Sequence, residues 1–529
     1  MKKFYVFLFT CLLTISFTAI PSCSDDDKPS TPSGPVPVKQ SNSPLANATD
    51  VALDASVTVT FDNDITLTNN GSITISDASG VSASATNNTL TIAHAAFEYG
   101  KEYTVNIPTI AITNLAEAIT WKFTTVADNT PVPDDPVFST TLTLGSTAYT
   151  IDSTYTEKVE DGLWYTYAQI KNDACPQIIH SVRLNAKSTK HRVESWIANE
   201  KLGGTGESPI DMVERKQTDQ NKDVAVAING GFYAVNTHVP VSFAMYNDLI
   251  VHSQFKSLGT SEFMENTPII GFDLQNTPYM DWVYVDATVV DKNDTKAQIT
   301  SINDRRWADD LVLYNSYFWA DSTRTNEWGT EALLAPINGE WEKFASHKNV
   351  KCKVEQVSTY SVDRSMPIPK GKLVLSGNGP ASDYVANLQV GDQVTVSTQI
   401  KLESDEEQRI RYAVAGWNFI LQNDEVQAEA GWDDAAAILI PRNPRTSVGY
   451  STDKEYIYYT IVEGRRPGIA AGVSTSELGQ IMKWLGAGNA INLDGGGSSA
   501  LVVNGELKNH PQDDGNVRRV VDGLAIIRK

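Results

Sequence analysis

Residues 490–501 combine backbone and side chains that suit chemistry on an anion. They read Ala-Ile-Asn-Leu-Asp-Gly-Gly-Gly-Ser-Ser-Ala-Leu. Consecutive glycines cost backbone entropy and add little to a core, but they let backbone N–H groups approach a ligand closely. With the flanking carboxylate and hydroxyls, they predict a cradle for a phosphate or sugar-phosphate at a strand end, whereas the structural alternative is a plain glycine-rich turn. The predicted cradle consists of Asp494, Gly495, Gly496, Gly497, Ser498 and Ser499.

Two common loop chemistries are excluded by the residues around these glycines. A Walker-type phosphate loop needs Gly-Lys-Ser/Thr and a following helix. Here no lysine is present, and the next residues look like a strand closed by the hairpin signal Asn504-Gly505. A Gly-x-Ser-x-Gly nucleophile elbow fails because Ser498 is followed by Ser499 and Ala500.

Two further segments carry arginines that could meet an anion. Arg445-Thr446 follows Asn443-Pro444, and arginine offers a planar fork for phosphate or carboxylate, although such a segment could equally be a solvated turn. Glu463 and Arg465 end a strand-like run that begins at Tyr456. Glu463 could be an acid–base group tuned by its neighbour, or half of a surface ion pair that contributes little to stability.

Asn229-Gly230-Gly231 is another candidate, since Asn229 could donate to a sugar hydroxyl or a phosphate oxygen. It could also form only a tight turn. Arg518 and Arg519 are expected to supply charge at a lid or edge. Among the acids, Asp494 and Glu463 are the best pair for glycoside chemistry, which normally uses two carboxylates.

No cofactor is predicted. The seven histidines form no His-Glu-x-x-His pair, and each is expected to be structural or solvated. The sequence has no Cys-x-x-Cys, which disfavours a zinc site of that type. A divalent cation bridging carboxylate and phosphate is compatible with the candidates, but no ligand spacing requires one.

One helix is expected to position the glycine loop. Ser474 and Glu477 have capping-box spacing, and Gly486 is a plausible stop. The apolar stripe between them has helical periodicity and comprises Leu478, Ile481, Met482 and Leu485. The helix leads directly into residues 490–493, so we expect Asp494 at the tip of a strand that follows a helix.

The chain begins with a targeting segment. Lys2 and Lys3 precede a short apolar run, and small residues lead to Cys23, as in a bacterial lipoprotein signal covering residues 1–22. The acidic residues after Cys23 resemble the surface-export tags of Bacteroidetes lipoproteins, with an ordinary secretory signal as the alternative. We therefore expect lipidation at Cys23, a tether over residues 23–40, and a lipid anchor at the outer membrane, with surface exposure.

Composition indicates two domains after the tether. Residues 41–127 are rich in Thr, Val, Ile, Ser and Asn, and their short, evenly spaced strands predict an all-β sandwich that resembles bacterial Ig-like domains. A proline-containing linker is expected at 128–137, and residues 138–529 would form the larger unit. Val224–Ile228 within it is an apolar run typical of a buried strand.

Charge and cysteine content limit the partners. A formal charge of −21 disfavours nucleic acid, whose phosphates would be repelled. Cys11 leaves with the signal, and Cys175 and Cys352 could pair in an oxidising compartment, although their spacing cannot show proximity.

In chain order, these segments resemble the phosphodiester glycosidase family, which includes N-acetylglucosamine-1-phosphodiester α-N-acetylglucosaminidase. The resemblance covers roughly residues 200–529 and is strongest at 440–525. It rests on 229–233, 443–449, 463–465, the capped helix, 492–499, and Arg518 with Val520. It departs from the family at Glu463, a position often held by aspartate, and after Tyr233, where His238-Val239-Pro240-Val241 replaces a glycine-containing turn.

The resemblance implies an α/β domain with a mixed sheet that hydrolyses the bond between a sugar's anomeric carbon and a phosphodiester. It implies Asp494 and Glu463 as catalytic carboxylates. The remaining cradle residues and arginines would bind the phosphodiester: Asn229, Gly230, Arg445, Thr446, Arg465, Gly495, Gly496, Gly497, Ser498, Ser499 and Arg518. The expected substrate is a sugar-1-phosphodiester in a glycan or cell-wall polymer. A non-catalytic glycan-binding lipoprotein is the alternative, and adhesion through the Ig-like domain is a third.

Overall fold

The computed structural model describes residues 34–126, 135–172, 175–254, 267–344, 346–358, 365–404, 410–427, 440–512 and 515–529. The chain forms two compact units that divide between Val132 and Pro133, within the stretch expected to be a linker. The expected signal peptide, the Cys23 lipidation site, residues 24–33 of the tether and residues 128–134 of the linker lie outside the described residues.

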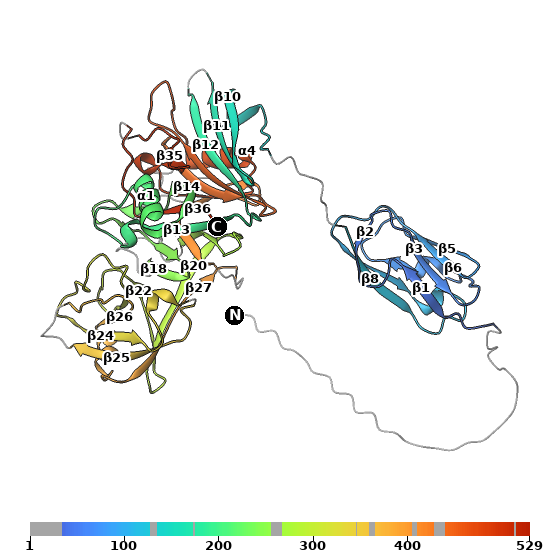
Figure 1. The fold of residues 1–529 in the computed structure, drawn as a ribbon, viewed down its shortest axis with the longest axis horizontal. Coiled ribbons are helices and arrows are strands. Elements are labelled where there is room, and N and C mark those ends of the chain that lie inside the picture. The colour runs from blue at the N-terminus through green and yellow to red at the C-terminus, as the bar shows by residue number, and fades with distance from the viewer. Residues whose placement is uncertain are drawn as a thin grey trace, which may run out of the picture. The chain divides into compact units, whose positions relative to one another are not determined.

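The first unit is a sandwich of two four-stranded sheets (Figure 1). One sheet has the order β1 (Lys39–Ser43), β3 (Val57–Phe61), β6 (Thr89–Ala93), β5 (Ser82–Thr86). The other has the order β2 (Ala48–Val51), β8 (Ile119–Thr125), β7 (Glu102–Ile107), β4 (Thr74–Ile75). Alternate residues of β3 and β7 are buried between the sheets, with Trp121 and Phe123 in the same core. The predicted all-β Ig-like region is therefore confirmed.

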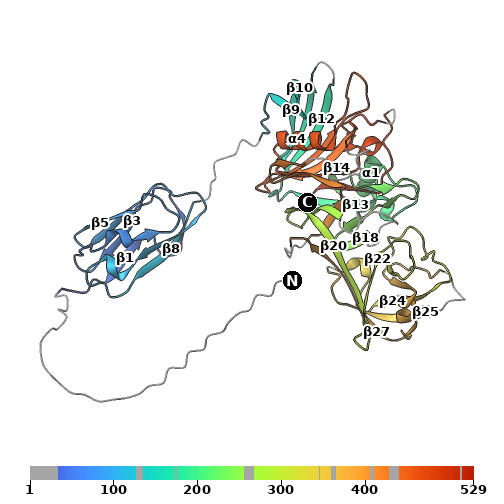
Figure 2. The ribbon, with the colours of Figure 1, turned by 180° about the vertical axis from the view of Figure 1, so that it is seen from behind.

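The second unit contains a nine-stranded sheet that carries the candidate loop. Its order is β30 (Glu425–Val426), β29 (Asn418–Gln422), β33 (Asn489–Asn492), β31 (Arg445–Tyr450), β32 (Tyr456–Val462), β12 (Gln177–Asn185), β11 (Leu163–Lys171), β10 (Thr147–Glu160), β9 (Thr141–Leu144). Helix α4 (Thr475–Leu485) lies against one face of this sheet (Figure 2). Its apolar stripe packs onto that face.

The helix prediction is confirmed in detail. The Ser474 side chain accepts from the Glu477 N–H, the Glu477 carboxylate accepts from the Ser474 N–H, and Gly486 ends the helix at φ 105°. Leu478, Ile481, Met482 and Leu485 are buried, so the helix is fixed to the sheet from which β33 runs to Asp494.

A five-stranded sheet stacks on the other side of this core. Its order is β13 (His191–Ile197), β36 (Asp522–Arg528), β14 (Asp223–Asn229), β34 (Leu501–Val503), β35 (Glu506–Leu507). The apolar core between the sheets draws residues from both. The buried strand predicted at 224–228 is β14, with antiparallel neighbours on both sides. Asn504 and Gly505 have positive φ between β34 and β35, which confirms the predicted hairpin.

The remaining strands form a twelve-stranded sheet. Its order is β19 (Thr267–Phe272), β28 (Tyr412–Ala415), β17 (Phe243–Tyr246), β18 (Leu249–Gln254), β22 (Ser301–Ile302), β23 (Leu311–Tyr314), β26 (Leu373–Asn378), β24 (Gly329–Pro336), β25 (Val350–Ser358), β27 (Gln393–Leu402), β20 (Pro278–Val290), β21 (Lys296–Gln298). An additional β19–β20 pairing brings the sheet back on itself around a large apolar core. A small hairpin, β15 (Tyr233–Ala234) with β16 (Val239–Pro240), stands apart.

The expected α/β character of this unit is not confirmed. Its described α-helices are α1 (Pro209–Gln220), α2 (Pro380–Ala386) and α4, of 12, 7 and 11 residues. Strands dominate because the sheets bury one another's apolar faces. Cys175 and Cys352 are both free thiols. Within the described ranges, no helix is long and apolar enough to cross a membrane.

Candidate active site

Asp494 lies two residues after β33 and is hydrogen-bonded to the end of β14. Its backbone N–H donates to the Gly230 carbonyl at 3.1 Å, and its carbonyl accepts from Asn229 Nδ2 at 2.7 Å. Asn229 and Asp494 are 265 residues apart in sequence. The structure thus brings together the Asn-Gly-Gly segment and the glycine-rich loop that the sequence singled out separately.

The Asn229 side chain is hydrogen-bonded to both ends of the loop. Its Oδ1 lies 3.0 Å from Thr446 Oγ1 and accepts from the Ala500 N–H at 3.2 Å. Thr446 Oγ1 also lies 3.1 Å from Ser499 Oγ. Asn229, Thr446 and Ser499 are buried. The amide predicted to meet substrate instead binds the loop's backbone, and the two hydroxyls extend the side-chain network beside it.

Two of the three glycines and Ser498 form a short 3-10 turn, Gly496–Ser498, and Gly495 lies at its start. Gly496 has φ 60° and its N–H donates to the Pro444 carbonyl at 2.9 Å. A Cβ on Gly495 would lie 2.7 Å from the same carbonyl oxygen, too close for a side chain. The close approach of Pro444 therefore requires glycine at 495, and the left-handed backbone conformation favours glycine at 496.

Two arginines flank this turn. The Arg518 guanidinium fills the space that a Cβ on Gly497 would need. Arg465 Nη1 would lie 3.5 Å from a Cβ on Gly496, and its Nε donates to Asn443 Oδ1 at 2.9 Å. Arg465 is exposed and Arg518 half-buried. The turn is thus lined by two guanidinium groups, which suits an anionic ligand.

Arg445 does not take the role expected of it. It is buried, its Nε donates to the Val473 carbonyl at 3.0 Å, and its Nη2 donates to the Pro441 carbonyl at 2.8 Å. These bonds fasten the strand start beneath the glycine turn. Arg445 therefore serves the framework, while Arg465 and Arg518 face the turn.

The Asp494 carboxylate is half-buried at the loop. Burial raises its pKa to about 6, against the opposing effects of the Ser498 hydroxyl, the Gly495 N–H and Arg518. The Gly495 N–H donates to Asp494 Oδ1 at 2.9 Å, which fixes the carboxylate's orientation. A carboxylate with this pKa is ionised at neutral pH, yet basic enough to accept a proton.

Glu463 is buried within a hydrogen-bonded network. Its Oε1 lies 3.0 Å from His180 Nε2 and accepts from the His510 N–H at 2.7 Å, while Oε2 pairs with Arg466 Nη1. Burial alone would raise its pKa, but His180, the His510 N–H and Arg466 outweigh that effect and the pKa is lowered. The surface ion pair between Glu463 and Arg465 is therefore wrong: the partner is Arg466, and the carboxylate is buried.

His180, Arg466 and Asp522 are polar residues near these groups that sequence reasoning missed. His180 gave no signal, since its partner Glu463 is 283 residues away. Asp522 did give one, as a lone acid in the apolar run Val520-Val521-Asp522-Gly523-Leu524. It is 1% exposed, and burial raises its pKa to about 7.

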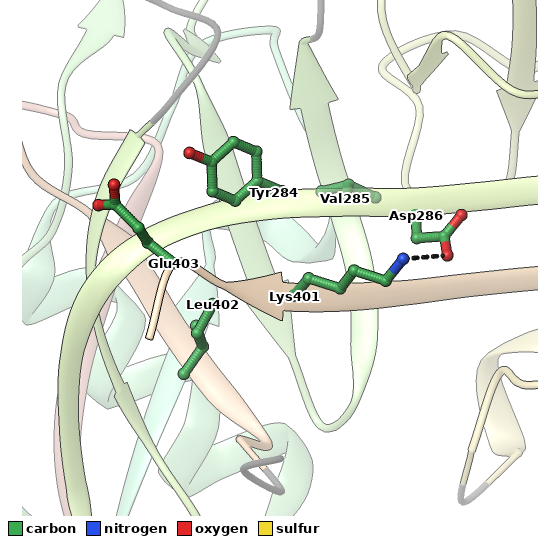
Figure 3. Close-up of a pocket in the computed structure, with 6 residues that line it drawn as sticks. All are labelled: Tyr284, Val285, Asp286, Lys401, Leu402 and Glu403. Carbon is green, nitrogen blue, oxygen red and sulfur yellow. Dashed lines mark ion pairs between the residues drawn. The ribbon is translucent and has the colours of Figure 1, made fainter. Parts of the chain in front are cut away.

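Elsewhere, a shallow pocket lies along β20 and β27 (Figure 3). It is lined by Tyr284, Val285, Asp286, Lys401, Leu402 and Glu403. Lys401 Nζ pairs with Asp286 Oδ2 at 2.8 Å, so the charges satisfy each other, and none of the predicted site residues lines this pocket. Over the described ranges, no group of three or more His, Cys, Asp or Glu side chains is arranged to hold a metal ion.

Comparisons with known proteins bear on both units. Residues 345–527 match the phosphodiester glycosidase family model, and residues 35–125 match the bacterial Ig-like domain model. The first match includes Glu463, the glycine loop and Asp522, whereas Asn229 precedes it. No curated protein matches the chain.

Two solved structures share the fold at low identity, and a third matches with a lower TM-score. A hypothetical protein from Synechocystis is 15% identical with a TM-score of 0.55, over 92% of this chain and 81% of that one. A putative exported protein from Burkholderia pseudomallei is 17% identical with a TM-score of 0.52, over 95% and 98%. The catalytic domain of zebrafish N-acetylglucosamine-1-phosphodiester α-N-acetylglucosaminidase, auto-inhibited by its pro-peptide, is 12% identical with a TM-score of 0.34, over 71% and 88%.

Proposed function

Because the chain carries a phosphodiester glycosidase domain after a bacterial Ig-like domain, we propose that it hydrolyses sugar-1-phosphodiesters. The bond broken joins the sugar's anomeric carbon to the phosphate oxygen. One observation supports this proposal above all. Asp494 stands at the start of the glycine turn, and the guanidinium groups of Arg465 and Arg518 lie beside that turn. The proposed substrates are N-acetylglucosamine-1-phosphodiesters in glycans or cell-wall polymers.

Arg465 and Arg518 hold the phosphodiester at the turn. Negative charge on the phosphate grows as the glycosidic C–O bond breaks, so fixed guanidinium groups stabilise the transition state more than the bound substrate. Phosphate leaves readily once this charge is stabilised. A strong general acid is therefore less important than for an ordinary glycoside.

Asp494 is the catalytic carboxylate of the proposal. Its pKa of about 6 leaves it ionised at neutral pH. From the loop it activates a water molecule or stabilises positive charge on the anomeric carbon. Glu463 is a supporting anion, because both of its oxygens are bound by His180, the His510 N–H and Arg466.

We also propose that the protein is lipid-anchored through Cys23 at the outer membrane and exposed at the cell surface. The Lys2-Lys3 start, the apolar run and the residues leading to Cys23 support this. The Ig-like unit would then act as a spacer between the anchor and the hydrolase. Labelling with a fatty acid, compared between wild type and Cys23→Ala, tests the anchor.

The test of activity is release of free sugar from an N-acetylglucosamine-1-phosphodiester, such as a UDP-sugar or a methyl phosphodiester. Wild type is compared with Asp494→Asn, with thermal melts to check folding. We expect turnover in wild type and a loss of at least about 10³-fold in the variant. Absence of turnover in a folded wild type, on both substrates, contradicts the proposal.

A non-catalytic glycan-binding protein is the second candidate. It is favoured by the fact that Asn229, Arg445 and Glu463 are all engaged by the protein's own groups. Tight binding of N-acetylglucosamine-1-phosphate without turnover would support it.

A further inference from the structure

We propose that Asp522 is a positioning residue that shares one proton with Asp494, so that the two carboxyl groups carry a single negative charge when an anionic substrate binds. This inference deepens the proposed function and rests on it for the substrate. The proton sharing itself belongs to the protein alone and can be tested without substrate.

The two residues bracket one glycine. The Gly230 N–H donates to the Asp522 carbonyl at 3.0 Å, and the Gly230 carbonyl accepts from the Asp494 N–H at 3.1 Å. A Cβ on Gly230 would overlap the Asp522 carboxylate. The Asp522 side chain therefore lies against the turn that anchors the Asp494 loop.

One oxygen of Asp522 is bound and the other is not. Oδ1 accepts from the Gly231 N–H at 2.8 Å. Oδ2 is buried and has no hydrogen-bond partner among the residues that the structure describes, and the whole residue is 1% exposed. An ionised carboxylate buried without a cation is strongly disfavoured, whereas a protonated one is not.

The charged groups around Asp522 also favour its protonated form. Asp494 is the charged group that acts on Asp522, and it raises the pKa of Asp522 further after burial has done so, against the Gly231 N–H. Arg518 acts on Asp494. Glu207, which bridges to Val520 at the start of the same segment, is already bound by Arg215.

Two such groups titrate as a pair. Burial and the neighbouring charges put their pKa values at about 6 for Asp494 and about 7 for Asp522. The first proton to leave comes from the more exposed Asp494, and Asp522 keeps the second. Between these values the pair carries one negative charge.

The charge of the Asp494–Asp522 pair affects the binding of an anionic substrate. Above pH 7 a second negative charge develops behind Asp494 and repels the phosphodiester. The KM of wild type should therefore rise on the order of 10-fold between pH 6.5 and 8.5. The acidic fall in kcat, set by Asp494, is a separate effect.

Asp522→Asn is the informative variant. Asparagine keeps an oxygen for the Gly231 N–H and never ionises, so the local structure is preserved while the second charge is removed. We expect the KM of the variant to stay level from pH 6.5 to 8.5, with the acidic limb of kcat retained. An alkaline rise in KM equal to that of wild type would overturn the proposal.

Thermal melts without substrate separate this inference from the proposed activity. Asp522 has a raised pKa in the folded protein, so its stabilising effect is fully present at low pH and is lost as pH rises through about 7. Asp522→Asn should flatten the decline in Tm over pH 5.5–8.

If that variant does not fold, Asp494→Asn should move the midpoint of the decline in Tm to lower pH, because the like charge is gone. A flat wild-type profile, or a midpoint unmoved by Asp494→Asn, contradicts proton sharing. Both effects without turnover on any phosphodiester would leave the pair standing and remove the proposed function.

Discussion

His180 Nε2 lies 3.0 Å from Glu463 Oε1, although 283 residues separate them. The contact links β12 to the residue that follows its neighbouring strand β32, and Tyr165 OH lies 2.8 Å from the other ring nitrogen of His180. The chain Tyr165–His180–Glu463–Arg466 is thus a polar network at one end of the sheet, buried except at the half-buried Arg466. It fixes the strand end from which Arg465 extends.

Replacing Glu463 should therefore cost stability. Glu463→Gln removes the charge that binds His180 and Arg466, and we expect a loss of about 2 kcal/mol in the free energy of unfolding at pH 7. The pKa of Glu463 is lowered in the folded state. Its contribution to the free energy of unfolding is therefore present above the pKa of the unfolded chain and is lost as pH falls below about 4.3. Urea unfolding at pH 7 and pH 4 measures both effects.

Glu506→Gln is the matched control for this change. The Glu506 side chain is 76% exposed beside Lys508, so its replacement should alter stability by less than about 0.5 kcal/mol. Equal losses in the two variants would show that the buried network contributes nothing specific.

Gly497 is expected to be intolerant of any side chain. Gly497→Ala would displace the Arg518 guanidinium, and we expect kcat/KM to fall by about 10- to 100-fold through lost phosphate binding. Gly505→Ala in the next hairpin is the control. It has φ 79° with nothing within 4 Å of the added Cβ, so it should cost about 1 kcal/mol of stability and leave kcat/KM unchanged. Unchanged kinetics in Gly497→Ala would mean that Arg518 is not needed at the turn.

Replacing Arg445 should lower stability, whereas replacing Arg518 should lower activity. Arg445→Met removes a charged donor from the Val473 and Pro441 carbonyls, which then keep only Asn443 as donor, and should lower the free energy of unfolding by about 2–4 kcal/mol. Arg518→Met should instead lower kcat/KM by about 100-fold. Arg519→Met, at the exposed neighbouring position, is its control and should change kcat/KM by less than about 3-fold. Melting curves and steady-state kinetics on the three variants check this, and the reverse pattern would contradict it.

Ionised Asp494 should be required for turnover and should lower the stability of the folded protein. Turnover requires the ionised carboxylate, so kcat should fall as pH drops below about 6. Because its pKa is raised in the folded state, the ionised group destabilises the fold at higher pH. Asp494→Asn should therefore be about 1–2 kcal/mol more stable than wild type at pH 7.5. A less stable variant at that pH would contradict the burial that raises the pKa.

Local sequence signals predicted local structure well. The capping box at Ser474 and Glu477, the stop at Gly486 and the hairpin at Asn504-Gly505 all formed as expected, because each depends on residues a few positions apart. Asp494 stands after the strand that follows this helix, as the order of elements predicted. The α/β description of the second unit is not confirmed, and its twelve-stranded sheet could not be foreseen because it joins segments whose pairing partners lie far along the chain.

The site was predictable in its residues more than in their roles. Asp494, the glycine turn, Arg465 and Arg518 do meet, but Arg445 and Asn229 proved to bind backbone groups. Whether an arginine faces a ligand or a buried carbonyl depends on the tertiary packing, which spacing does not encode. His180 and Asp522 were missed because their importance comes from partners that only the folded chain supplies.

Hydrolysis in H₂¹⁸O shows whether the protein breaks the glycosidic C–O bond, as proposed for the Asp494 loop, or the P–O bond. An N-acetylglucosamine-1-phosphodiester is turned over in labelled water, and the released phosphate monoester is weighed by mass spectrometry. We predict that the phosphate carries no ¹⁸O, because water attacks the anomeric carbon. One ¹⁸O in the phosphate would show attack at phosphorus and would contradict the account.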